Sequence, residues 1–79
     1  MNLTIRYFAS LREQRGLNEE TWSTSASTLG ELYEELRQKH GFTLGSELVR
    51  PAVDGEFAEM TDPVADGAEV VFVPPVAGG

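Results

Sequence analysis

The segment from Val70 to Val73 constrains the fold most, because its four consecutive apolar residues give a strand no polar face to turn to water. Such a strand is best buried between neighbours, so we expect it at the centre of a sheet. Pro74 and Pro75 follow it directly, and a proline has no backbone N–H with which to continue the pairing. The sequence therefore predicts a central strand that ends at these two prolines.

The residues after the prolines are small and uncharged: Val76, Ala77, Gly78 and Gly79. No charged side chain occurs from Val70 onward, although 24% of the residues in the chain are charged. A frayed terminus is the ordinary alternative, but disordered tails are usually polar. We therefore predict a folded domain of residues 1–73 and an extended, flexible tail of residues 74–79, with the α-carboxylate of Gly79 at its tip.

The composition of the 79-residue chain excludes several classes of protein. Because it has no cysteine and one histidine, it offers no disulfide, no thiolate nucleophile and no Cys-based or His-rich metal site. A net charge of -7 opposes binding to nucleic acid or to an anionic membrane, and it favours a basic protein partner. With no apolar run of membrane-spanning length and no signal-peptide pattern, we expect one small cytoplasmic domain.

The N-terminal residues 2–9 alternate as a strand with one buried face, formed by Leu3, Ile5 and Tyr7. Phe8 falls on the opposite face, which it shares with Thr4 and Arg6. An aromatic ring on that face either lies under a loop of the same chain or contacts a partner protein, and the sequence leaves both alternatives open.

Two further elements follow before the middle of the chain. Residues 10–15 indicate a short helical turn with Leu11 buried, ended by Gly16. Residues 19–25 then indicate a strand that pairs with the first in a hairpin with a long connection. Trp22 lies in this strand, where we interpret it as a residue that packs on the sheet.

The clearest element is a helix that begins at Thr28. Thr28 and Glu31 have the spacing of a capping box, in which each side chain accepts from the other residue's backbone N–H. Four apolar residues follow at helical spacing and form one stripe: Leu29, Leu32, Tyr33 and Leu36. Gly41 ends the helix, and His40 before it suits the negative end of the helix dipole better than the role of a catalytic base.

The remaining pattern completes the predicted fold. Asp54 and Gly55 mark a tight hairpin between two short strands, after an irregular stretch at residues 42–49. The order is strand, strand, helix, short strands, strand. If the first and last strands lie side by side and parallel, the helix crosses one face of a mixed sheet. This arrangement predicts an α+β fold of the ubiquitin-like β-grasp type.

No active site is evident within the folded domain. The chain has no glycine-rich phosphate loop after a strand and no serine or threonine with a base at a recognisable spacing. The tail offers different chemistry, because activation of a carboxylate by ATP gives a mixed anhydride that can accept sulfur or an amine. Gly78 and Gly79 lack Cβ atoms, so the walls of a partner's narrow site can approach the backbone, while Pro74 and Pro75 restrict the direction of the arm.

Three segments resemble the small subunits of molybdopterin synthase, the MoaD-type sulfur carriers: Tyr7-Phe8-Ala9 with Leu11-Arg12-Glu13, Pro51-Ala52-Val53-Asp54-Gly55-Glu56, and residues 66–79 with their Pro-Pro-Val-Ala-Gly-Gly end. The resemblance covers the whole chain. Asp54 and Ala68 depart from the Asn and Asp that are common in the family, but both are turn positions away from the tail.

The resemblance implies a sulfur carrier that takes part in molybdenum cofactor biosynthesis. Gly79 would be adenylated with ATP by a ubiquitin-activating-like enzyme, converted to a thiocarboxylate with sulfur from a donor protein, and would then donate that sulfur to cyclic pyranopterin monophosphate. The implied synthase is a heterotetramer in which the large subunit supplies the catalytic groups, so this chain would be a sulfur donor with no permanently bound cofactor. Carried over by position, Gly78 is the neighbour in the tunnel, and six residues contact partners: Phe8, Val73, Pro74, Pro75, Val76 and Ala77.

Two other functions use the same tail. A sulfur carrier could serve thiamine synthesis, tRNA thiolation or a biosynthetic sulfhydrylase, although thiamine-type carriers usually lack the Pro-Pro-Val element. A ubiquitin-like modifier would instead join its terminus to lysines of other proteins. Because Lys39 is the one lysine of this chain, polymeric chains could form through a single side chain only.

Overall fold

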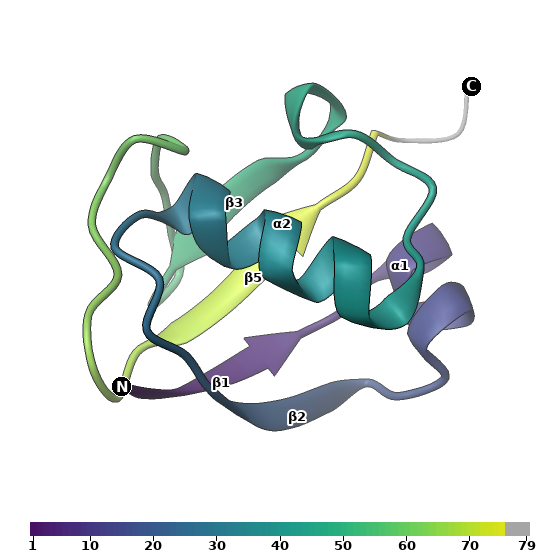
Figure 1. Cartoon of the computed structure of the whole chain (residues 1–79). Coiled ribbons are helices and arrows are strands. Elements are labelled where there is room, and N and C mark those ends of the chain that lie inside the picture. The colour runs from purple at the N-terminus through teal and green to yellow at the C-terminus, as the bar shows by residue number, and fades with distance from the viewer. Residues whose placement is uncertain (76–79) are drawn as a thin grey trace.

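The computed structural model describes residues 1–75 and contains one mixed sheet crossed by one main helix, as the sequence predicts (Figure 1). The sheet order is β2-β1-β5-β3-β4. Along the chain the elements are β1 (Asn2–Arg6), α1 (Ala9–Arg15), β2 (Glu19–Ser23), α2 (Leu29–His40), a 3-10 helix (Ser46–Leu48), β3 (Arg50–Val53), β4 (Glu56–Phe57) and β5 (Glu69–Val73). In the described part of the chain, no helix is long and apolar enough to cross a membrane.

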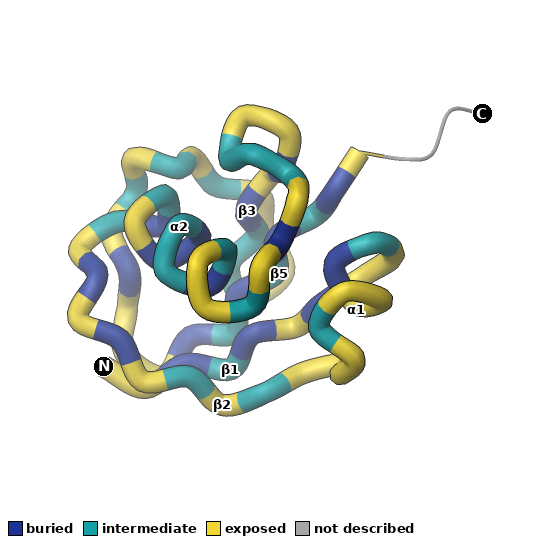
Figure 2. The backbone as a smooth tube through the Cα atoms, turned by 45° about the vertical axis from the view of Figure 1, so that its right-hand side comes forward, coloured by how far each residue is buried: buried dark blue, intermediate teal, exposed yellow. Residues whose placement is uncertain are grey.

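The last strand, β5, is the centre of the sheet, which confirms its predicted position. It pairs in parallel with β1, where Ile5 lies opposite Val70, and antiparallel with β3, where Pro51 lies opposite Phe72. The prediction of burial on both faces is wrong in part. Val70 and Phe72 are buried, whereas Val71 and Val73 on the other face are only half-buried, because the main helix covers one face of the sheet and leaves the other open (Figures 1 and 2).

Helix α2 packs its predicted apolar stripe onto the covered face of the sheet. All four stripe residues are buried: Leu29, Leu32, Tyr33 and Leu36. They meet the buried residues of the strands, among them Leu3, Ile5, Val70 and Phe72, in one core. The helix also positions the loop after it, since the Tyr33 hydroxyl donates to the Leu44 carbonyl at 2.7 Å.

The start of α2 differs slightly from the predicted capping box. The Thr28 hydroxyl accepts from the Glu31 backbone N–H at 3.2 Å, as expected for an N-cap. The Glu31 carboxylate, however, accepts from the N–H of Ser27 at 3.0 Å and not from that of Thr28. At the other end, Gly41 has a positive φ of 73°, a conformation that glycine adopts without strain.

The predicted Asp54-Gly55 turn joins β3 to β4. Both residues have positive φ, 50° for Asp54 and 88° for Gly55, as a two-residue hairpin of this twist requires. Asp54 also fastens the turn to β5: its carboxylate accepts from the Glu69 N–H at 2.9 Å, and its own N–H donates to the Glu69 carbonyl at 2.9 Å. The hairpin is therefore fixed in register against the strand that leads to the tail.

We expect Leu36→Ala to lower the free energy of unfolding by about 2–5 kcal/mol, because the side chain is fully buried and its removal leaves a cavity under α2. Leu48→Ala is the matched control, since Leu48 is 50% exposed and its truncation should cost less than about 1 kcal/mol. Urea unfolding of both variants measures the difference. Equal losses in the two variants would contradict this account of the core.

Candidate functional site

The root of the tail leaves the sheet at its centre. β5 ends at Val73, after which Pro74 is buried and Pro75 is exposed. Pro74 therefore packs within the domain, and the chain reaches the surface at Pro75. The predicted donor residues Gly78 and Gly79, with Val76 and Ala77, lie outside the described residues.

The face of the sheet opposite α2, which we call the open face, carries a row of side chains that crosses four strands. Strand register places Phe57 of β4 beside Ala52 of β3, Ala52 beside Val71 of β5, and Val71 beside Arg6 of β1. The row is apolar except for Arg6 at one end. Nothing in residues 1–75 covers it as α2 covers the other face, so the apolar strip stays accessible to a partner (Figures 1 and 2).

Phe8 lies at the same end of the sheet as the root of the tail. β1 ends at Arg6, and Phe8 is the N-cap residue of α1, so the predicted first strand is shorter than residues 2–9. Phe8 is 46% exposed, so no loop of residues 1–75 buries it, and its contact with a partner stays a prediction. The parallel pairing of β1 and β5 ends with Arg6 opposite Val71, so Phe8 and Val73, each two residues further along, lie at the same end of the sheet.

A contact that the sequence analysis missed lies on the other side of the root. The guanidinium carbon of Arg50 lies 4.0 Å from the centroid of the Phe57 ring, within the range of a cation–π interaction. Phe57 is 60% exposed, the most exposed large apolar residue of the described chain. The sequence contains a signal for this contact. A two-residue turn at Asp54-Gly55 fixes Phe57 opposite Ala52, and therefore on the same face of the sheet as Arg50.

On the covered face, a partly buried polar cluster connects four segments of the chain through Glu20 of β2. Its carboxylate accepts from the Tyr7 hydroxyl at 2.5 Å and from the Arg15 guanidinium at 2.9 Å and 2.8 Å. His40, at the end of α2, places Nε2 3.1 Å from the same carboxylate, without the alignment of a good hydrogen bond. Glu20 thus holds the residue after β1, the end of α1 and the end of α2 to one point.

The charges of this cluster are fixed by its neighbours. The hydrogen bonds from Arg15 lower the pKa of Glu20 to about 2. Burial lowers the pKa of His40, with Arg15 adding to the effect, so the imidazole is neutral at pH 7. Burial and the adjacent Glu20 raise the pKa of the Tyr7 hydroxyl. Because the lone pairs of Glu20 are occupied by donors of this chain, the cluster is suited to holding the fold rather than to acid–base catalysis.

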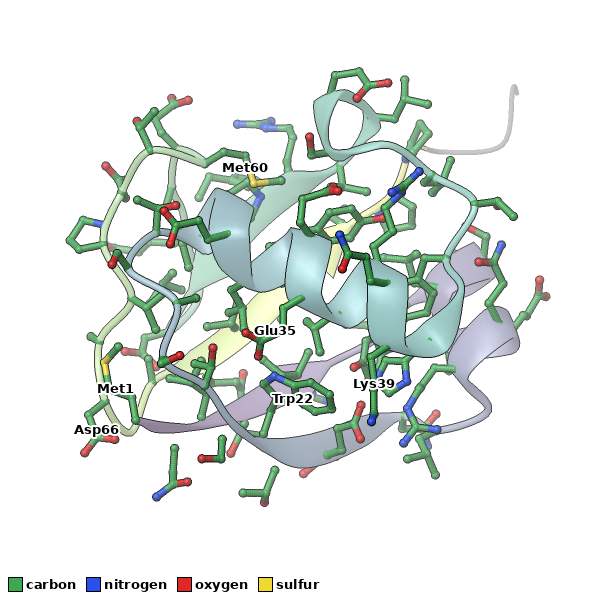
Figure 3. All side chains as sticks on the ribbon, in the orientation of Figure 1. Met1, Trp22, Glu35, Lys39, Met60 and Asp66 are labelled. Carbon is green, nitrogen blue, oxygen red and sulfur yellow. The ribbon has the colours of Figure 1, made fainter. Side chains whose placement is uncertain are left out.

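Trp22 lies next to this cluster and packs against the core, as predicted for a residue of the sheet. Its indole N–H donates to the Glu35 carboxylate of α2 at 2.7 Å, and the Thr24 hydroxyl donates to the same carboxylate at 3.2 Å (Figure 3). Its ring centroid lies 5.3 Å from that of His40. His40 is therefore a packed residue of the domain, as well as the helix-end residue that the sequence indicates.

Residues 1–75 hold no pocket and no group of three or more side chains that could bind a metal ion. In this part of the chain, the open face and the root of the tail beside it present apolar side chains at the surface.

We expect Glu20→Gln to lower the free energy of unfolding by about 2 kcal/mol at pH 7, since it leaves Arg15 without its charged partner. The ionised Glu20 stabilises the fold fully above its ordinary pKa of 4.5, and this contribution is lost as the pH falls from 4.5 to about 2. The difference in stability between wild type and variant should therefore shrink across that window. Glu13→Gln, at an exposed position of α1, is the control. A difference that stays constant through the window would contradict the lowered pKa.

Comparison with known proteins agrees with this architecture. A family model described as the ThiS family matches residues 5–79. SAMP1 from Haloferax volcanii has a TM-score of 0.81, with 24% sequence identity and 100% of each chain covered. A putative molybdopterin converting factor, subunit 1, from Pyrococcus furiosus has a TM-score of 0.78, with 26% identity, 95% of this chain covered and 98% of that chain.

A third similar structure comes from a protein–protein complex of subunits 1 and 2 of molybdopterin-converting factor from Helicobacter pylori 26695. It has a TM-score of 0.68 and 24% identity, and 100% of each chain is covered. A search of curated protein sequences gave no match. The structural matches confirm the ubiquitin-like β-grasp fold predicted from the sequence, and the family model, which spans nearly all of its length, shows that the chain belongs to the ThiS family.

Proposed function

We propose that the chain is the sulfur carrier subunit of molybdopterin synthase. In this proposal Gly79 is adenylated, converted to a thiocarboxylate and used to donate sulfur to cyclic pyranopterin monophosphate. The observation that carries the proposal is that the Pro-Pro-Val-Ala-Gly-Gly segment follows the central strand directly in the sequence and lies within the family match. The chain would act in the cytoplasm, where ATP is available for the activation step.

The chemistry of the tail determines which step each protein would perform. A free carboxylate is a poor electrophile, so the adenylating enzyme joins it to AMP from ATP and pyrophosphate leaves. A sulfur donor then supplies the sulfur that displaces AMP and leaves a thiocarboxylate. Gly79 is the acyl carrier in both steps, and Gly78 lets the walls of each partner's site approach the backbone. The groups that act on the pterin belong to the large subunit, and ATP is bound by the adenylating enzyme.

The open face supplies the docking surface in this proposal. Phe8 and Val73 follow the paired parts of β1 and β5 at the same end of the sheet, and Val73 precedes Pro74. A partner that covers both residues would also fix the direction in which the tail enters its site. Burial of exposed apolar side chains supplies affinity, and aromatic anchors are common among the residues that contribute most to binding.

Molybdopterin is favoured over other sulfur acceptors by two observations. The Pro-Pro-Val element is unusual for thiamine-type carriers, and the similar Pyrococcus furiosus protein, at 26% identity, is described as a putative molybdopterin converting factor subunit. Carriers for tRNA thiolation or for a sulfhydrylase, and ubiquitin-like modifiers, remain the alternatives that the following experiment separates.

Deletion of Gly79 should abolish sulfur transfer and change the melting temperature by less than a few degrees, because residues between Leu3 and Phe72 form the core of the described domain. The full-length chain, incubated with the adenylating enzyme of its source organism, ATP and a sulfur donor, should gain the mass expected for one oxygen replaced by sulfur. The loaded chain with the large subunit should then convert cyclic pyranopterin monophosphate to molybdopterin.

Each other outcome points to a different function. A thiocarboxylate that forms but does not serve the large subunit would favour another sulfur acceptor. Covalent adducts of the chain with lysines of other proteins would favour a modifier. Full sulfur transfer by the deletion variant would rule out Gly79 as the carrier.

Phe8→Ala should weaken binding to the large subunit by about 1.5–3 kcal/mol, one to two decades in Kd, and should affect folding less, because the ring is 46% exposed in the free chain. Calorimetric titration measures affinity, and urea unfolding in parallel measures stability. Leu17→Ala is a control, because Leu17 is similarly exposed, at 42%, in the connection after α1. A large loss of stability with unchanged affinity would make Phe8 a residue of the fold and not of the interface.

A further inference from the structure

We propose that Arg50, held against Phe57, binds a carboxylate of the partner protein beside the root of the tail, and so helps to select which protein receives the tail. This inference rests on the proposed function, since it concerns the same docking surface. The proposed contact is polar and of defined charge, whereas the other residues proposed for docking on the open face are apolar.

Arg50 is placed next to the tail by strand pairing. It lies opposite Val73 in the antiparallel ladder of β3 and β5, one residue before Pro74. Its side chain projects on the open face, because Arg50 and Ala52 alternate with Pro51, which is buried against the core side. Arg50 therefore lies on the strand next to the root of the tail, with its guanidinium directed toward β4.

Phe57 keeps the guanidinium in place without using its donors. The 4.0 Å separation from the ring centroid places the guanidinium over the face of the ring. A guanidinium has five N–H donors, all in its own plane, and its stacking on a ring leaves them free for other contacts. The side chain is thus ordered before binding, which lowers the entropy that binding would otherwise cost.

Arg50 has no acidic partner within residues 1–75, unlike three of the other four arginines. Arg6 lies 3.9 Å from Glu19 and 3.8 Å from Glu69, Arg15 is paired with Glu20, and Arg37 with Glu34. Among residues 1–75, no carboxylate lies within ion-pair distance of Arg50. Arg12 and Lys39 also form no ion pair within residues 1–75, but among these three cations only Arg50 is held over an aromatic ring. A carboxylate is the group whose geometry matches the paired donors of a guanidinium.

Charge complementarity indicates which kind of partner surface can lie opposite Arg50. The net negative charge of the chain attracts a partner surface that is basic overall. Arg50 would repel a lysine or arginine placed opposite it, so the partner must present an acidic side chain at that one point, next to an apolar patch that covers Phe57 and Val73. A protein with the basic surface but without the acid would be drawn to the carrier and then bind it poorly.

The test uses the full-length chain and the purified large subunit of molybdopterin synthase from the same organism. Arg50→Glu should weaken binding at least about tenfold, because it replaces attraction by repulsion at a desolvated position. Arg50→Lys should lose part of the affinity, since an ammonium keeps the charge but not the paired donors. Lys39→Glu is the matched control, because it makes the same change of charge on α2, on the opposite side of the sheet (Figure 3), and we expect it to change Kd by less than about threefold.

Two further measurements separate the possible outcomes. Unfolding of Arg50→Glu should stay within about 1 kcal/mol of wild type, because an exposed cation–π contact contributes no more than this. Replacing the partner's acidic interface residues one at a time with lysine should identify one that restores binding to Arg50→Glu. If the wild type binds and Arg50→Glu binds equally well, the proposed role of Arg50 is wrong, and the sulfur-carrier proposal stands. The same conclusion follows if Lys39→Glu loses as much affinity for the large subunit as Arg50→Glu does. If the wild-type chain does not bind the large subunit, both are wrong.

Discussion

The one-sided burial of β5 is the constraint on which the rest of the structure depends. Val70 and Phe72 point into the core beneath α2, while Val71 and Val73 point to the open face. The strand β5 therefore holds the sheet together, through β1 on one side and β3 on the other, and places apolar surface beside the root of the tail. Because the core and the proposed docking surface share this strand, a substitution at Val70 or Phe72 would disturb the open face only by moving the strand itself.

The sequence predicts much of this arrangement, because most of its signals are local. The capped helix, the Asp54-Gly55 turn and the parallel first and last strands are all present where the patterns indicate. The error at Val71 and Val73 has a physical cause. A run of apolar residues shows that a strand is to be shielded from water on both faces, but it does not show whether the same chain or another protein provides the second cover.

The features that escaped prediction combine residues from distant parts of the chain. Glu20 meets Tyr7, Arg15 and His40 only after four elements have been assembled, and nothing in the sequence near Glu20 distinguishes it from exposed carboxylates. Arg50 and Phe57 become neighbours through a turn whose register the sequence predicts, but the contact between their side chains was not predicted. The Glu20 cluster also bears on the candidate site, since it fixes α1, whose first turn follows Phe8.

The position of β5 between two partners has a mechanical consequence. Hydrogen bonds to β1 and β3 run roughly across the strand, so a pull on Pro75 along the strand direction loads both ladders in shear and strains many bonds together. An edge strand pulled away sideways would instead lose its bonds one after another. In the proposed function, where partners draw the end of the chain into narrow sites, the domain can therefore bear traction on that end and stay folded.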